Sequence, residues 1–163
     1  MRLLIIFLTF SFYSNAQEIP ARWDELTASD WPKALEKSSR TCILPIGILE
    51  KHGPHAPMGS DLIHVREWAA RAAKKEYAVV FPDYFYGQIN EARHQPGTFA
   101  LPNRLVLELL DSTCAEIGRN GFNKIYNDKR PRRKPRSDQV FSSISIREKK
   151  RLCHIFFPAY QGF

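Results

Sequence analysis

Apolar residues in the first three quarters of the chain form short continuous runs that alternate with helical stripes. The runs at 40–48 and 77–82 are nearly all apolar, as expected for strands buried on both faces of a sheet, and a third strand begins at 122–126. Residues 61–75 and 103–119 instead carry apolar side chains at the i, i+3, i+4, i+7 spacing of a helix. This alternation predicts an α/β fold with a mostly parallel sheet.

Possible metal ligands are concentrated directly after the first apolar run. Glu50 and His52 are two residues apart, so an extended backbone directs both side chains to one face, and His55 and Asp61 follow. Frequent glycine and proline between 45 and 59 predicts tight turns there. Two carboxylates and an imidazole suit Zn or Mn, although solvated loop side chains would give the same bare pattern.

A second candidate segment is the long loop at 83–103, which follows the second predicted strand. A loop of this length is unusual for a plain connection, and long ordered loops after strands often carry function. Glu91, His94 and Thr98 are its candidates for contacts with a substrate or with the metal ligands, and the alternative is that they are ordinary loop residues.

The complete ligand segment is more specific than its individual residues. It reads E-x-H-G-x-H-x-P-x-x-x-D, which here is Glu50, His52, Gly53, His55, Pro57 and Asp61, and a YG…PGT element follows at 86–98. Both resemble the creatininase family of metal-dependent amidohydrolases. The resemblance covers about residues 20–125 and implies a three-layer α/β/α fold with a mostly parallel sheet, incomplete at the C-terminus.

The resemblance also implies a chemistry. Glu50, His52 and Asp61 would be ligands of a site for two divalent ions, Zn or Mn, at which a metal-activated water hydrolyses the C–N bond of a small linear or cyclic amide. His55 would orient that water or carry a proton to the departing nitrogen, or else support the turn. Glu91 and His94 complete the expected catalytic set, and the intact protein is expected to form a homo-oligomer.

The N-terminal residues have the features of a secretory signal. Arg2 precedes a short apolar core at 3–13, and Ser14, Asn15 and Ala16 provide small residues for cleavage before Gln17. The apolar core is too short for a permanent membrane anchor. We therefore expect a signal peptide at 1–16, a creatininase-like domain at 17–125, and export to the periplasm or the extracellular space. A buried strand is the alternative interpretation of the apolar core.

The basic character of the chain belongs to its last residues. Residues 127–163 hold ten lysines and arginines against three acids, which accounts for the whole formal charge of +7. A basic nucleic-acid or targeting patch and a solvated tail are the two conventional explanations, but an exported protein is not expected to meet nucleic acid. Cys42 and Cys114 lie in apolar patterns and are predicted to be buried thiols rather than a disulfide.

A shift of reading frame explains the tail better. The family motif at this position reads approximately GFKKIIIVNGHGGN, and its histidine completes the metal site, yet residues 123–153 contain neither histidine nor glycine. Removing one base from the Tyr126 codon allows the DNA for 126–135 to be read as IMINGHGGN, aligned with the motif without a gap. Residues 126–163 are therefore predicted to be off-frame, without regular periodicity, and this chain to be inactive. The alternative function is a non-catalytic exported remnant that binds metal or a partner.

Overall fold

The computed structural model describes residues 18–127, 143–148 and 151–156, and side chains only within the first range. Its core is a three-stranded parallel sheet in the order β2-β1-β3. The helices and strands, in chain order, are η1 (Trp23–Glu25), α1 (Trp31–Lys37), β1 (Thr41–Ile43), α2 (Ser60–Lys75), β2 (Val79–Val80), η2 (Asn90–Ala92), α3 (Asn103–Arg119), β3 (Lys124–Tyr126), β4 (Ser143–Glu148) and β5 (Arg151–Phe156).

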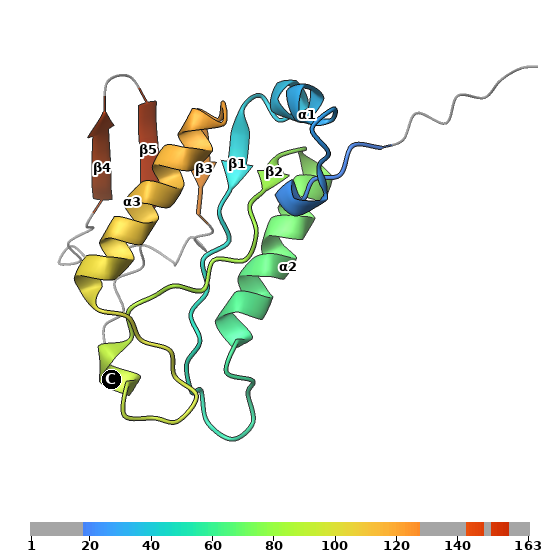
Figure 1. The fold of residues 1–163 in the computed structure, drawn as a ribbon. Helices are drawn as coiled ribbons and strands as arrows, with labels where there is room; N and C mark the ends of the chain where they lie inside the picture. The colour runs from blue at the N-terminus through green and yellow to red at the C-terminus, as the bar shows by residue number, and fades with distance from the viewer. Residues whose placement is uncertain (1–17, 128–142, 149–150, 157–163) are drawn as a thin grey trace, which may run out of the picture.

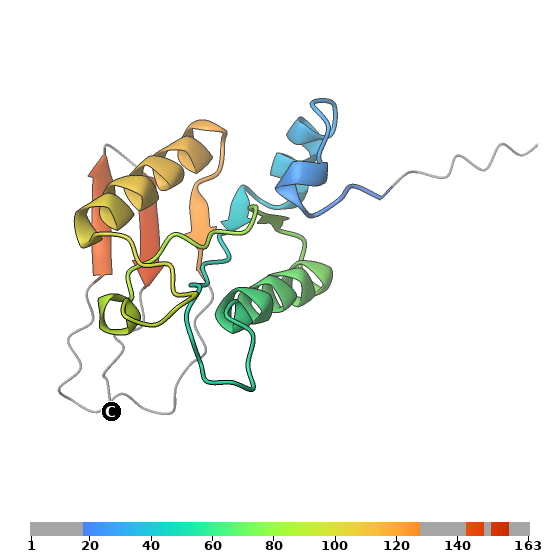
Figure 2. The same cartoon turned by 60° about the horizontal axis from the view of Figure 1, so that its bottom comes forward.

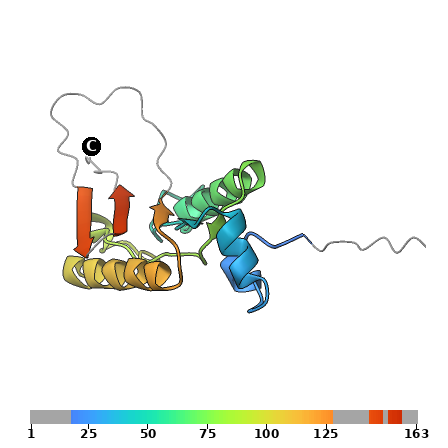
Figure 3. The same ribbon diagram turned by 90° about the horizontal axis from the view of Figure 1, so that it is seen from above.

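Two long helices cover opposite faces of this sheet, as the view from above shows (Figure 3). Neighbouring residues of β1 divide between the two faces because side chains alternate along a strand. Cys42 packs in the cluster that contains Leu110 and Ile117 of α3, whereas Ile43 packs against the cluster of Ala69 and Ala73 of α2. The predicted α/β fold with a three-layer arrangement is thereby confirmed (Figures 1 and 2).

The strands are shorter than the apolar runs that predicted them. The run at 40–48 gives only three residues of β1 because Pro45 has no N–H for the ladder. The chain nevertheless stays beside the segment that follows β2: Gly47 N donates to Tyr84 O at 3.0 Å, and Tyr84 N donates to Pro45 O at 3.2 Å. The extended backbone therefore continues beyond β1 toward the predicted ligands.

Aromatic side chains close the end of the core where α1 enters. Trp23, Trp31 and Phe122 contact one another with ring centroids 4.5 to 5.8 Å apart, and Phe122 is buried. Cys42 and Cys114 are buried thiols rather than a disulfide, as predicted. Burial raises the pKa of Cys42 to about 12, so this thiol stays protonated near neutral pH.

The sequence after Tyr126 shows no steady periodicity and left the order of the tail open, yet residues 143–148 and 151–156 form two strands. β4 and β5 form an antiparallel pair in which Ser143 is opposite Phe156, and β5 lies beside β3 at the edge of the sheet (Figures 1 and 3). Serine and isoleucine alternate in Ser143–Glu148 with the period of a strand, a signal that the sequence analysis missed. The predicted signal peptide at 1–16 and the basic run at 128–136 lie outside the described residues. Within the described part of the chain, no helix is long and apolar enough to cross a membrane.

Candidate metal centre

The ligand segment forms a loop between the extended chain after β1 and the first turn of α2. Glu50 N donates to Met58 O at 2.9 Å, which closes the loop. Gly53 within it has a φ of +100°, a conformation that side chains with a Cβ rarely adopt. The turn returns the chain toward Glu50, and Asp61 is in the first turn of α2.

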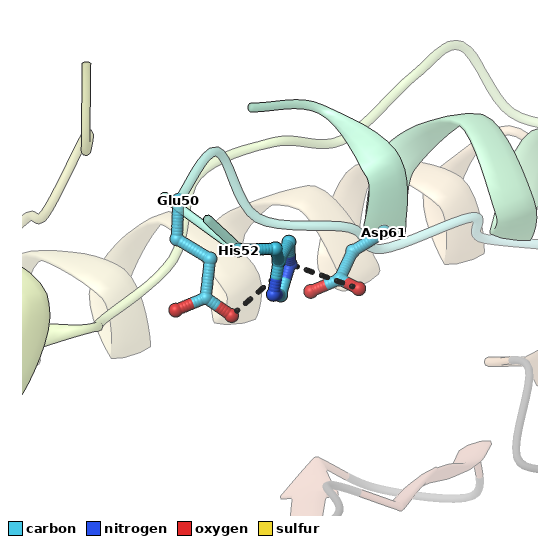
Figure 4. Close-up of side chains that lie close together, drawn as sticks. All are labelled: Glu50, His52 and Asp61. Carbon is cyan, nitrogen blue, oxygen red and sulfur yellow. Dashed lines mark ion pairs between the residues drawn. The ribbon is translucent and has the colours of Figure 1, made fainter. Parts of the chain in front are cut away.

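Glu50, His52 and Asp61 converge at this point (Figure 4). His52 Nε2 lies 3.6 Å from Glu50 Oε1 and 3.6 Å from Asp61 Oδ1. One potential ligand atom from each of the three residues falls within 4.8 Å of the others, and no other such group of histidine, cysteine, aspartate or glutamate occurs in the described residues. The three residues that the sequence offers as candidate metal ligands, by their residue types and by the resemblance to the creatininase family, are thus brought together by the fold.

The hydrogen bonding of His52 supports a metal at this position. Its Nε2 is closed off from solvent and has no hydrogen-bond partner, because 3.6 Å is too long for a hydrogen bond to either carboxylate. A buried polar atom without a partner is costly unless another group satisfies it. An imidazole nitrogen between two carboxylates is a donor set that a divalent cation fits.

The electrostatics of the loop lead to the same conclusion. Glu50 is only 6% exposed, and burial is the main reason why its pKa is raised above the ordinary value. The charges of Asp61 and Glu91 raise it further, while His52 opposes them. The site therefore places negative charge where water is scarce, and a bound cation would offset the free-energy cost of ionising the buried Glu50 carboxylate.

The family comparison agrees with this geometry. Residues 24–127 match the profile of the Creatininase family, described as creatinine amidohydrolase. The chain belongs to the creatininase family. The match contains the whole ligand segment and ends where the basic tail begins.

Individual creatininase relatives match only part of their own length. Creatinine amidohydrolase of Pseudomonas putida is 26% identical over 106 residues, which are 62% of this chain and 41% of the relative. The 3-dehydro-scyllo-inosose hydrolase of Thermotoga maritima is 33% identical over 84 residues, 50% of this chain and 27% of the relative. The chain thus spans about two fifths or less of the curated relatives it matches.

Solved creatininase structures give the same picture. A mutant creatininase is 25% identical, with a TM-score of 0.62 over 66% of this chain and 44% of its own. A mutant creatininase of the Zn-Zn type is also 25% identical, with a TM-score of 0.61 over 66% of this chain and 43% of its own. The described core therefore corresponds to less than half of a solved creatininase chain.

The other predicted site residues lie outside the ligand group. His55 is exposed, and its ring packs against Gly53, where a Cβ would meet His55 Cε1 at 3.2 Å. Glu91 is exposed in η2 and accepts a hydrogen bond from Gln88 at 3.4 Å. His94 is exposed and bonds to Gln95. Of these three residues, only Glu91 affects a candidate metal ligand, because its negative charge raises the pKa of Glu50. The catalytic roles of all three remain predictions.

Contacts between the two loops were not predicted from the sequence. Phe99 N donates to Leu49 O at 2.9 Å, and Lys51 Nζ donates to Gln95 Oε1 at 3.1 Å. The loop at 83–103 is thereby fixed on both sides of Glu50. Thr98 Oγ1 is buried there without a hydrogen-bond partner. The sequence marked Thr98 both as a candidate contact residue of the long loop and as part of the PGT element.

Proposed function

We propose that Glu50, His52 and Asp61 bind a divalent cation, with zinc as the first choice, and that the centre serves the hydrolysis of an amide bond in a small substrate. The observation that carries this proposal is the enclosed, unpaired His52 Nε2 placed 3.6 Å from each of two carboxylates. Zinc accepts imidazole nitrogen and carboxylate oxygen as ligands. The similarity to a creatininase of the Zn-Zn type supports the choice of metal, and manganese is the alternative.

When bound, a divalent ion lowers the pKa of a coordinated water to about 7 and polarises a carbonyl group. The chain's own residues supply the conditions for that chemistry. Glu50 and Asp61 provide the compensating negative charge, and burial of Glu50 keeps competing water away from one side. His52 contributes its lone pair at Nε2, which no hydrogen bond occupies. His55 is the exposed imidazole proposed to orient water or to carry a proton, and Glu91 and His94 are proposed to complete the catalytic set.

A small cyclic amide is the substrate class that we propose. The relative from Pseudomonas putida acts on creatinine according to its name, whereas the relative from Thermotoga maritima is named for an inosose. Both names denote small polar ring compounds. Creatinine is therefore the first compound to assay. We further propose that the intact protein binds two divalent ions and forms a homo-oligomer.

A second candidate function is that of a metal-binding fragment without turnover. The described residues bring together three ligands in one group, and the chain spans 41% of the creatinine amidohydrolase that it matches. A site for two ions needs further ligands, so we propose that this chain binds one ion weakly and does not hydrolyse amides. Export remains part of the proposal, since the predicted signal at 1–16 supports it.

Zinc titration of the purified chain tests the centre. The chain should bind zinc by calorimetry, and His52→Ala should weaken binding at least about tenfold because it removes a ligand. His64→Ala is the matched control: His64 is exposed on α2 and outside the ligand group, so affinity should not change. Equal zinc affinity for wild type and His52→Ala would refute the centre.

Metal content and a creatinine assay then separate the two functions. Two tightly held ions with creatinine turnover would support the enzyme, whereas one weakly bound ion without turnover would support the metal-binding fragment. No bound ion at all would refute the centre. The assay should include a range of small cyclic amides, because creatinine is one member of the proposed class.

A further inference from the structure

We infer that Gln95 fixes the neutral His94 imidazole in its Nδ1–H tautomer and is thereby a positioning residue in the loop that bonds to Lys51 of the ligand segment. This inference deepens the proposed function and rests on it for its catalytic meaning. The tautomer itself is a property of three side chains, Lys51, Gln95 and His94, and can be measured without metal or substrate.

Lys51 sets the orientation of the Gln95 amide. Its ammonium group can only donate, so the atom that it contacts at 3.1 Å must be the acceptor, Gln95 Oε1. The NH₂ group of the same amide then faces His94, with 2.8 Å between Gln95 Nε2 and His94 Nε2. An amide NH₂ can only donate, so His94 Nε2 must accept, and the proton of the neutral ring is on Nδ1.

The other arrangements of these three groups lose a hydrogen bond. An Nε2–H tautomer or an imidazolium would direct a donor at the NH₂ of Gln95. Rotating the amide by 180° would correct that contact but would turn the NH₂ toward Lys51, which also only donates. Lys51 therefore selects the tautomer of His94 through Gln95.

The chain of hydrogen bonds starts at Lys51 in the ligand segment. Lys51 follows Glu50 directly, and Phe99 N, which donates to Leu49 O, holds the other end of the second loop. His94 Nδ1 has no hydrogen-bond partner among the described residues, so its N–H is available to a ligand. With its Nε2 lone pair engaged, neutral His94 offers this N–H as a donor and is not a general base. A fixed donor of this kind stabilises negative charge that develops on a substrate oxygen.

Long-range ¹H–¹⁵N correlation spectra of the histidine rings test the inference, because they show which ring nitrogen carries the proton. The resonance of His94 is assigned by its loss in His94→Asn, and spectra are taken at a pH where the ring is neutral. We expect mainly Nδ1–H in the wild type. Gln95→Ala should remove this preference, and Gln95→Glu should reverse it to Nε2–H, because a carboxylate only accepts.

Gln88→Ala is the matched control. Gln88 is a second glutamine of the same loop and donates to Glu91 rather than to His94, so its loss should leave the His94 tautomer unchanged. Nε2–H as the main wild-type form, or the same tautomer in wild type and Gln95→Ala, would overturn the inference. Neither result depends on zinc, so failure here is distinct from failure of the zinc titration.

Discussion

Leu62 of α2 lies so close to Gly47 that a Cβ added to Gly47 would come within 2.4 Å of the Leu62 Cα. Real side chains do not approach backbone atoms so closely, so only glycine permits this contact. Gly47 precedes Glu50 by three residues, and Leu62 follows Asp61. The close approach of this extended segment after β1 to the start of α2 is therefore what brings the two carboxylates to the same imidazole.

Gly47→Ala should both destabilise the fold and weaken metal binding. The added methyl must push α2 away, and overpacking of this kind costs about 1–3 kcal/mol. The displacement would also carry Asp61 away from His52. Urea denaturation and zinc titration measure the two effects.

Gly59→Ala is the control for this change, since an added Cβ would meet only Leu49 Cδ2 at 3.4 Å, an ordinary contact. Because alanine is a poor N-cap residue, we expect it to cost at most about 1 kcal/mol and to keep zinc affinity. Wild-type zinc affinity in Gly47→Ala would contradict the proposed role of the glycine.

Glu50→Gln should change stability and metal affinity in opposite directions. The pKa of Glu50 is raised in the folded state, chiefly by burial, so ionising it destabilises the metal-free fold. Stability of the wild type is lost as pH rises from the unfolded glutamate value, roughly 4.3, through the raised folded value. Glutamine avoids this loss, so the metal-free variant should be more stable than the wild type at neutral pH and not at acidic pH.

The same variant should bind zinc at least about tenfold more weakly, because one ligand charge is gone. Excess zinc should therefore stabilise the wild type more than the variant. Denaturation curves at several pH values, with and without zinc, measure both effects. A metal-free variant less stable than the wild type at neutral pH would show that the burial of Glu50 is compensated by the protein itself.

Two leucines of α3 test the packing of the helix on the sheet. Leu110 is 2% exposed and Leu105 is 41% exposed, so the same substitution samples core and surface on one element. Leu110→Ala should cost about 2–5 kcal/mol through lost burial and the cavity left behind. Leu105→Ala should change stability by about 0.5 kcal/mol at most. Similar losses of unfolding free energy for the two variants would contradict the packing of the Leu110 face of α3 on the sheet.

The reading frame at Tyr126 is tested by sequencing the coding DNA again. We expect an extra base in this codon, as a lesion or as a reading error. Its removal should continue the chain as GFNKIIMINGHGGN, with a histidine available to the metal centre. DNA that encodes 126–163 as given, with no creatininase-like sequence in the shifted frame downstream of the Tyr126 codon, would refute this proposal and leave the β4–β5 pair as an authentic part of the protein.

The sequence alone determined the order of the main helices and strands up to Tyr126 and the identity of the candidate ligands. Apolar runs and helical spacing located α2, α3 and the three parallel strands because burial on one or both faces leaves a direct trace in the pattern. The residue types of Glu50, His52 and Asp61 suit a metal but were weak evidence by themselves. The complete segment at 50–61 was specific through its resemblance to the creatininase family. The length of β1 was overestimated from its apolar run, because Pro45 has no N–H to continue the ladder and β1 ends before it.

Only the tertiary structure decided how the loops meet. The Gly47–Leu62 approach, the burial of Glu50 and the Lys51–Gln95–His94 contacts join segments that no local pattern connects. Each depends on the distance between a strand end, a helix start and a distant loop, which packing of the whole core sets. The sequence therefore indicated which residues could bind a metal. The fold determined the distances between them, the burial of Glu50 and the hydrogen bonds that hold the neighbouring loop.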